Sequence, residues 1–99
     1  MTTPLSFDRD ALGALCRRRH IRRLSLFGSA LKGTARPDSD IDLLVEFVPG
    51  KEPGLLGLAE IEGKLSLLLS RPVDLRTAQD LSEYFRDEVL RTAEVQYAA

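Results

Sequence analysis

Two aspartates separated by a single residue, Asp40 and Asp42, are the clearest candidates for chemistry in this sequence. They open an apolar–polar alternation over residues 40–47 that predicts a strand, and on a strand residues two apart point to the same face. The two carboxylates would lie roughly 6–7 Å apart at their Cβ atoms. Mg²⁺ prefers oxygen ligands of this kind, and two divalent ions about 3.5–4 Å apart can stabilise a displacement at phosphorus. An acid pair on a strand is more often simply solvated, so this interpretation needs support from other residues.

A third acid, Asp74, lies between the aliphatic residues Val73 and Leu75. Residues 73–76 predict a short strand with the aliphatic side chains pointing inward and Asp74 pointing outward. If this strand lies beside that of residues 40–47, three carboxylates converge on one patch. Their mutual repulsion would make a metal ion the natural partner.

A glycine–serine pair, Gly28-Ser29, ends the predicted strand of residues 21–27 and precedes a short predicted helix at residues 30–32, closed by Gly33. Backbone N–H groups at the start of a helix attract phosphate, and glycine lets the backbone approach a ligand closely. The Ser29 hydroxyl can also bond a phosphate oxygen. The alternative interpretation is that Ser29 only caps the short helix.

These two features have a fixed separation: ten residues lie between Ser29 and Asp40. The combination Gly-Ser, ten residues, Asp-x-Asp resembles the signature of the DNA polymerase beta-like nucleotidyltransferase superfamily. Residues 35–43, Ala-Arg-Pro-Asp-Ser-Asp-Ile-Asp-Leu, are similar to the pattern of its MNT branch. This branch consists of minimal nucleotidyltransferases, often encoded beside HEPN proteins as antitoxins.

The resemblance implies a transferase that moves AMP from ATP to a hydroxyl and releases pyrophosphate. Asp40 and Asp42 would hold two Mg²⁺ ions, and Asp74 would hold the ion that activates the acceptor hydroxyl and could receive its proton. Gly28 and Ser29 would bind the β- and γ-phosphates. Three further residues near the motif are candidate nucleotide contacts: Lys32, Arg36 and Ser39.

The resemblance also implies a partner. The acceptor would be a hydroxyl, taken to be that of a tyrosine, on a cognate HEPN toxin that forms a hetero-oligomer with this chain and is neutralised by the modification. Three alternatives remain open: an antitoxin that acts by binding alone, a transferase for small molecules such as antibiotics, and, more weakly supported, an enzyme that modifies nucleic-acid ends. The chain has little room for a separate acceptor-binding domain, which disfavours the small-molecule alternative.

The helices and strands that must position these residues are expected to form one minimal nucleotidyltransferase domain over residues 1–99. Its expected fold class is α/β (α+β), with a small central mixed sheet flanked by helices. Ile41, Leu43, Val45 and Phe47 are expected on one face of their strand. Ser6 or Asp8 can cap the first helix, and Ser82 or Asp80 the last. The predicted order is helix 8–19, strand 21–27, helix 30–32, strand 40–47, helix 55–69, strand 73–76 and helix 82–93.

The composition is that of a globular protein: 43% of the 99 residues are hydrophobic, 29% are charged, and the net charge is −1. This charge gives no overall electrostatic case for nucleic acid, so direct nucleic-acid binding is not expected. Five arginines between residues 17 and 23 are a local exception, interpreted as a solvated face rather than an RNA or acidic-partner contact. The single cysteine, Cys16, excludes an internal disulfide and is expected in the core. No apolar run approaches a membrane span, and the cytoplasm is the expected location.

Overall fold

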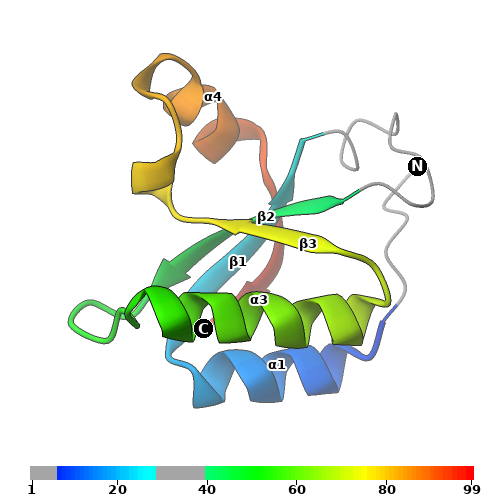
Figure 1. Ribbon diagram of the computed structural model, residues 1–99. Helices are drawn as coiled ribbons and strands as arrows, with labels where there is room; N and C mark the ends of the chain where they lie inside the picture. The colour runs from blue at the N-terminus through cyan, green and yellow to red at the C-terminus, as the bar shows by residue number, and fades with distance from the viewer. Residues whose placement is uncertain (1–6, 29–39) are drawn as a thin grey trace.

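The computed structural model describes residues 7–28 and 40–99, which form a mixed sheet flanked by helices (Figure 1). The predicted fold class is therefore confirmed. The predicted helix at residues 30–32 lies outside the described residues. The elements are α1 (Arg9–Arg18), β1 (Ile21–Phe27), β2 (Ile41–Phe47), α3 (Leu55–Leu69), β3 (Val73–Arg76), the 3-10 helix η1 (Ala78–Asp80), α4 (Glu83–Thr92) and β4 (Glu94–Ala98).

Within the described residues the sheet has four strands in the order β3-β2-β1-β4. β1 pairs antiparallel with both β2 and β4, whereas β2 and β3 run parallel. The parallel pair is made possible by α3, which carries the chain back between the two strands. β1, β2 and β3 have the predicted bounds, apart from Asp40, which precedes β2.

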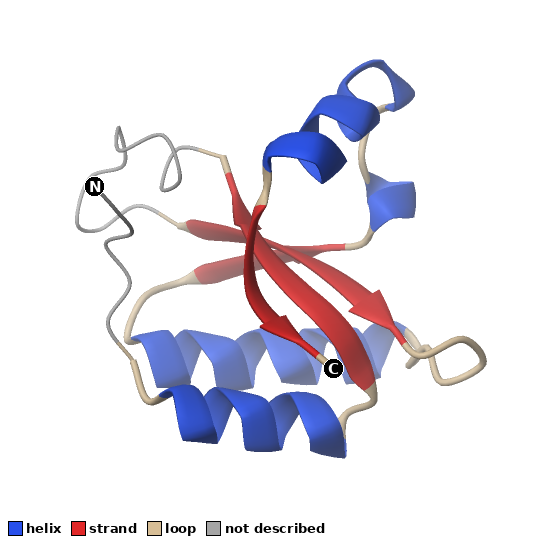
Figure 2. Cartoon of the chain, turned by 180° about the vertical axis from the view of Figure 1, so that it is seen from behind, coloured by secondary structure: helices blue, strands red, loops and turns tan. Residues whose placement is uncertain are grey.

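The main core lies between the sheet and two helices, α1 and α3, which lie side by side below it (Figures 1 and 2). In β2, Ile41, Leu43 and Val45 are buried in this core, as the alternation predicted. α3 contributes Ile61 and Leu65 at helical spacing. The position of α1 is fixed at its start by Asp8, whose side chain accepts hydrogen bonds from two backbone N–H groups of the first turn.

The expectation that Cys16 belongs to the core is confirmed. The thiol lies on the buried face of α1, where burial raises its pKa to about 12 against the opposing effect of Arg17. A thiol in this environment stays protonated at neutral pH and is chemically inert.

On the opposite face of the sheet, η1 contacts β2. α4 lies on the same side of the sheet as η1, away from α1 and α3 (Figure 1). Leu44 shares the face of Asp42, yet only 2% of it is exposed. The residue that follows η1, Leu81, is also buried. Asp42 therefore lies next to an apolar cover rather than on a freely solvated surface.

The last two elements differ in part from the prediction. α4 is close to the predicted helix, and the Ser82 hydroxyl caps it by accepting from the N–H of Tyr84. Asp80 instead caps η1, accepting from the N–H of Thr77. β4 was not predicted. Its signal, Val95-Gln96-Tyr97, is a single apolar–polar alternation directly after a helix, too short to distinguish from a frayed helix end.

The free edge of β3 is covered by side chains of α3. The Val73 N–H donates to Ser66 Oγ at 3.0 Å, and the Leu75 N–H donates to the carboxylate of Glu62 at 2.8 Å. These bonds satisfy backbone groups that an edge strand would otherwise leave unpaired. They also fix α3 along the strand that carries Asp74. Among the described residues, no helix combines the length and the apolar character needed to cross a membrane.

Candidate active site

Asp42 and Asp74 lie opposite one another on neighbouring strands. The parallel register of β2 and β3 pairs Ile41 with Val73 and Asp42 with Asp74, and neighbouring strands lie about 4.7–4.9 Å apart. The condition on which the sequence interpretation depended, that the third strand lies beside the second, is thus confirmed. The two acids meet because each follows an inward-pointing aliphatic residue at the same register position.

The electrostatics show that Asp40 and Asp74 both act on Asp42. Burial raises the pKa of Asp42 above its ordinary value, and the negative charges of Asp74 and Asp40 raise it further. The guanidinium of Arg76 opposes these effects. The surroundings of Asp42 therefore disfavour its ionised form, and a bound cation would stabilise that form.

Gly28 is required where β1 ends beside Asp42. Its backbone has a φ of 81°, in the left-handed region that residues with a side chain rarely adopt. A Cβ atom at this position would overlap the carboxylate of Asp42. The sequence predicted a glycine that lets the backbone approach a ligand; in addition, this glycine leaves room for the central carboxylate.

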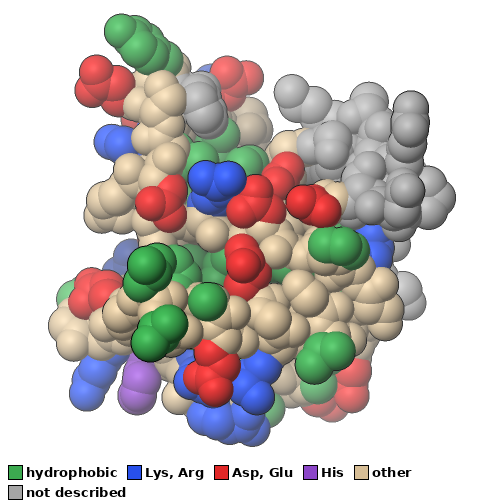
Figure 3. All heavy atoms as spheres, in the orientation of Figure 1, with side chains coloured by type: hydrophobic (Ala, Val, Ile, Leu, Met, Phe, Trp, Pro, Cys, Tyr) green, Lys and Arg blue, Asp and Glu red, His purple; other side chains and the backbone are tan. Residues whose placement is uncertain are grey.

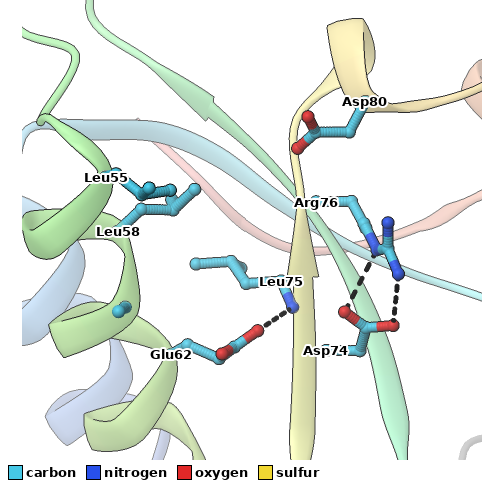
Figure 4. A pocket seen from close by; sticks show the side chains of 8 residues that line it. Leu55, Leu58, Glu62, Asp74, Leu75, Arg76 and Asp80 are labelled. Atoms are coloured by element: carbon cyan, nitrogen blue, oxygen red, sulfur yellow. Dashed lines mark hydrogen bonds and ion pairs between the residues drawn. The ribbon is translucent and has the colours of Figure 1, made fainter.

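Arg76 is a site residue that the sequence interpretation did not place. Its Nε and one terminal nitrogen each donate to a different oxygen of Asp74 at 3.1 Å, forming a bidentate ion pair (Figure 4). This pairing is the main reason that the pKa of Arg76 lies above its ordinary value, and the charges of Asp80 and Asp42 add to it. Arg76 is two residues from Asp74 on the same strand, so the strand parity that selected Asp74 also places Arg76 on its face.

A hollow of about 260 Å³ lies over these residues. We call it the Asp42 hollow; its lining comes from all the elements around the acids: Phe27, Asp42, Asp74, Arg76, Asp80 and Leu81. Figure 3 shows the acidic side chains gathered across the middle of this face, with a basic group next to them. The sequence interpretation missed three of these residues: Phe27, Asp80 and Leu81. Asp80 and Leu81 reach the site only through the packing of η1.

The other predicted site residues have different outcomes. Ser29, Lys32, Arg36 and Ser39 lie outside the described residues, so their roles stay predictions. Glu46 lies on the same side of β2 in the alternation as Asp42, four residues further along the strand. It forms ion pairs with Arg22 at 3.1 Å and Arg23 at 3.6 Å. Arg19, another member of the arginine cluster, pairs with Glu60 at 2.8 Å, so three members of the cluster are engaged within the molecule.

The fit of the site to a divalent cation rests on its carboxylates. Within residues 7–28 and 40–99, no three His, Cys, Asp or Glu side chains are arranged closely enough to hold a metal ion. Both oxygens of Asp74 are bonded to Arg76 instead. The donor set nevertheless has the oxygen chemistry that Mg²⁺ selects, and the negative charges of Asp74 and Asp40 act on the partly buried carboxylate of Asp42. Metal binding by Asp40, Asp42 and Asp74 stays a prediction.

Comparison with known proteins places the chain in a family. Residues 9–95 match the model of the nucleotidyltransferase domain. The chain is 40% identical over 71 residues to the protein adenylyltransferase MntA of Thermococcus cleftensis, covering 72% of this chain and 70% of that protein.

Solved structures agree with this family. One is a chain assigned as a minimal nucleotidyltransferase, 41% identical with a TM-score of 0.70, covering 86% of this chain and 85% of that one. A second is a complex of an MNT antitoxin with the tri-AMPylated HEPN toxin of Shewanella oneidensis, at a TM-score of 0.64. It is 22% identical and covers 92% of this chain and 70% of that one, so it supports the fold alone. The chain described here belongs to the nucleotidyltransferase domain family and is a relative of the protein adenylyltransferases.

Proposed function

We propose that this chain is an Mg²⁺-dependent protein adenylyltransferase that acts as an antitoxin. It would transfer AMP from ATP to a hydroxyl, taken to be that of a tyrosine, on a cognate HEPN toxin and thereby neutralise it. The observation that carries the proposal is the pairing of Asp42 with Asp74 across β2 and β3, beside a glycine that leaves room for the Asp42 carboxylate.

The relatives support the choice of donor and acceptor. The Thermococcus cleftensis relative is named a protein adenylyltransferase, which transfers AMP to a protein. The Shewanella oneidensis complex contains an AMPylated HEPN toxin together with its MNT antitoxin. We therefore assign the same two roles here, with this chain as the adenylyltransferase antitoxin and a HEPN protein as the toxin that it modifies.

In the proposed reaction, the acceptor oxygen forms a bond to the α-phosphorus of ATP while the bond from that phosphorus to the β-phosphate oxygen breaks. Pyrophosphate leaves with this electron pair, and the hydroxyl proton passes to the carboxylate of Asp74. Asp40, Asp42 and Asp74 would hold two Mg²⁺ ions, which neutralise the phosphate charge and polarise the reacting oxygens when bound. Gly28 and Ser29 would bind the β- and γ-phosphates, with Lys32, Arg36 and Ser39 as further contacts.

The experiment mixes the purified chain with the cognate HEPN protein that the proposal requires and with Mg·ATP, and then weighs both proteins by intact mass spectrometry. We expect one or more AMP masses on the HEPN protein and none on this chain. The Asp42→Asn variant should transfer nothing while keeping its circular dichroism spectrum. Wild-type protein that adds no mass would refute the transferase proposal. An Asp42→Asn variant that still neutralises the toxin in cells would show that binding alone is sufficient.

A further inference from the structure

A second hollow, also about 260 Å³, lies on the other side of Asp74, between α3 and the edge of β3 (Figure 4). We call it the α3–β3 groove. It shares Asp74, Arg76 and Asp80 with the Asp42 hollow. Its remaining lining residues are Leu55, Leu58, Ala59, Glu62 and Leu75. The two hollows therefore meet at the Asp74–Arg76 ion pair.

The groove has an apolar wall and a polar end. Leu55 and Leu58 point from α3 toward β3, and the Asp74–Arg76 pair lies at the far side (Figure 4). The carboxylate of Glu62 is already engaged, because it accepts the N–H of Leu75. The polar chemistry left to a ligand in this groove is thus concentrated at Asp74, Arg76 and Asp80.

The apolar wall continues onto the open surface. Leu55 and Leu56 in the first turn of α3 are 83% and 87% exposed, which is unusual for two adjacent leucines. Apolar side chains exposed together beside a site mark a surface that another molecule covers. The first turn of α3 is therefore suited to contact a protein that presents a side chain to the groove.

We infer that the α3–β3 groove binds the acceptor tyrosine of the proposed function, and that Leu55 and Leu56 contact the toxin around it. The inference rests on the proposed function. A transfer reaction needs two substrates that meet at one point, and among the residues that the structure describes, Asp74, Arg76 and Asp80 are the ones that belong to both hollows. The proposed function assigns the nucleotide to Gly28 and Asp42, and Asp42 lines the Asp42 hollow but not the groove, which leaves the groove for the acceptor.

A phenol matches the groove better than an aliphatic hydroxyl. Its ring offers apolar area to Leu55 and Leu58, and its oxygen lies at the end of the ring, toward Asp74. A serine or threonine hydroxyl would have to bring its own backbone into the groove.

The experiment compares acceptor kinetics in two matched pairs of variants, with the HEPN protein as acceptor. Leu55→Asn removes the wall of the groove, whereas Leu67→Asn changes a leucine of the same helix that is 82% exposed and lines neither hollow. Ala59→Trp fills the groove, and Leu67→Trp is its control. All four changes are on the surface of α3, so each variant is expected to fold.

We expect Leu55→Asn to raise the KM for the HEPN protein about tenfold or more, the usual effect of a lost apolar contact in a specificity pocket. Ala59→Trp should abolish transfer. Both variants should bind Mg·ATP like wild type in equilibrium dialysis, and both Leu67 variants should behave like wild type throughout. Replacing the modified tyrosine of the toxin by serine should reduce transfer at that position at least tenfold.

Two outcomes would overturn the inference while the proposed function stands. In the first, the wild type modifies the toxin, and the Leu55→Asn or the Ala59→Trp variant modifies it with an unchanged KM for the HEPN protein. The other is an Ala59→Trp variant that no longer binds Mg·ATP, because the groove would then belong to the nucleotide site. If instead the wild type transfers nothing to the toxin, the proposed function itself fails, and the inference fails with it.

Discussion

Asp42 ionises in an environment that opposes its charge. Burial raises its pKa, and the charges of Asp74 and Asp40 raise it further, whereas Arg76 lowers it. An acid with a raised pKa in the folded state binds more protons there than in the unfolded chain at pH values between the two pKa values. Stability therefore falls as pH rises through that window, and the ionised form makes an unfavourable contribution at neutral pH. A carboxylate site that is arranged to bind a cation lowers the stability of the fold when no cation is bound.

We therefore predict that Asp42→Asn is inactive yet more stable than wild type at pH 7, by roughly 0.5–2 kcal/mol. The reason is that the amide keeps the shape of the side chain and removes its repulsion with Asp74 and Asp40. Urea unfolding between pH 4 and pH 7 measures this, and the gap between the two proteins should widen as pH rises. Asp87→Asn, a change at an exposed position of α4, serves as the control and should shift stability little. A variant less stable than wild type at pH 7 would contradict the argument.

Arg76 competes with a cation for Asp74, because both oxygens of that carboxylate are bonded to its guanidinium. We predict that Arg76→Gln binds Mn²⁺, a spectroscopic substitute for Mg²⁺, several-fold more tightly than wild type when nucleotide is absent. Removing a positive charge next to Asp74 and Asp42 strengthens their attraction for a cation. Electron paramagnetic resonance of free Mn²⁺ measures the binding. Arg76→Lys keeps the charge but loses the bidentate geometry, so it should fall between the two. Unchanged or weaker binding by Arg76→Gln would refute the competition.

At the scale of elements, the end of β1 and the start of β2 fit each other closely. The register places Phe27 opposite Asp42, and the chain turns at Gly28 with a positive φ directly beside the carboxylate. Two separate constraints act at this glycine: the backbone conformation and the lack of space for a Cβ atom. Gly50 provides a comparison, because its φ of 84° is similar and nothing lies within 4 Å of the position of its Cβ atom.

We predict that Gly28→Ala destabilises the fold by about 2–4 kcal/mol, combining the left-handed strain of about 1–2 kcal/mol with displacement of Asp42. Gly50→Ala should cost only the strain, because its side chain enters open space. Chemical denaturation of both variants isolates the effect of the overlap with Asp42. Equal destabilisation by the two changes would mean that Asp42 moves aside freely. In that case Gly28 would be needed for its backbone conformation alone.

At the scale of the whole molecule, the elements with strong local patterns could be predicted from the sequence and those that depend on packing could not. The alternation in β2 and the aliphatic residues on either side of Asp74 fixed which face each acid occupies, and their separation from Gly28 identified the site. Nothing local to Arg76 shows that it bonds Asp74, because such a bond depends on rotamers. Similarly, Asp80 and Leu81 reach the site only because η1 folds back over the sheet.

β4 is the clearest failure of the sequence prediction, and it tests how far the sheet depends on its last strand. Tyr97 packs against the main core and is only partly exposed, whereas Tyr84 on α4 is 92% exposed. We predict that Tyr97→Ala destabilises the protein by roughly 1–3 kcal/mol through lost apolar burial, whereas Tyr84→Ala changes stability by less than about 0.5 kcal/mol. For a chain of this size, 1 kcal/mol shifts the melting temperature by roughly 4–8 °C, so thermal unfolding separates the two variants clearly.

The catalytic rate per folded molecule should stay the same in both, because β4 pairs with β1 along Arg23 to Leu26, away from the acids on β2 and β3. If Tyr97→Ala unfolds at the wild-type temperature, β4 is an appendage to the sheet, and the fold consists of the strands that the sequence already predicts.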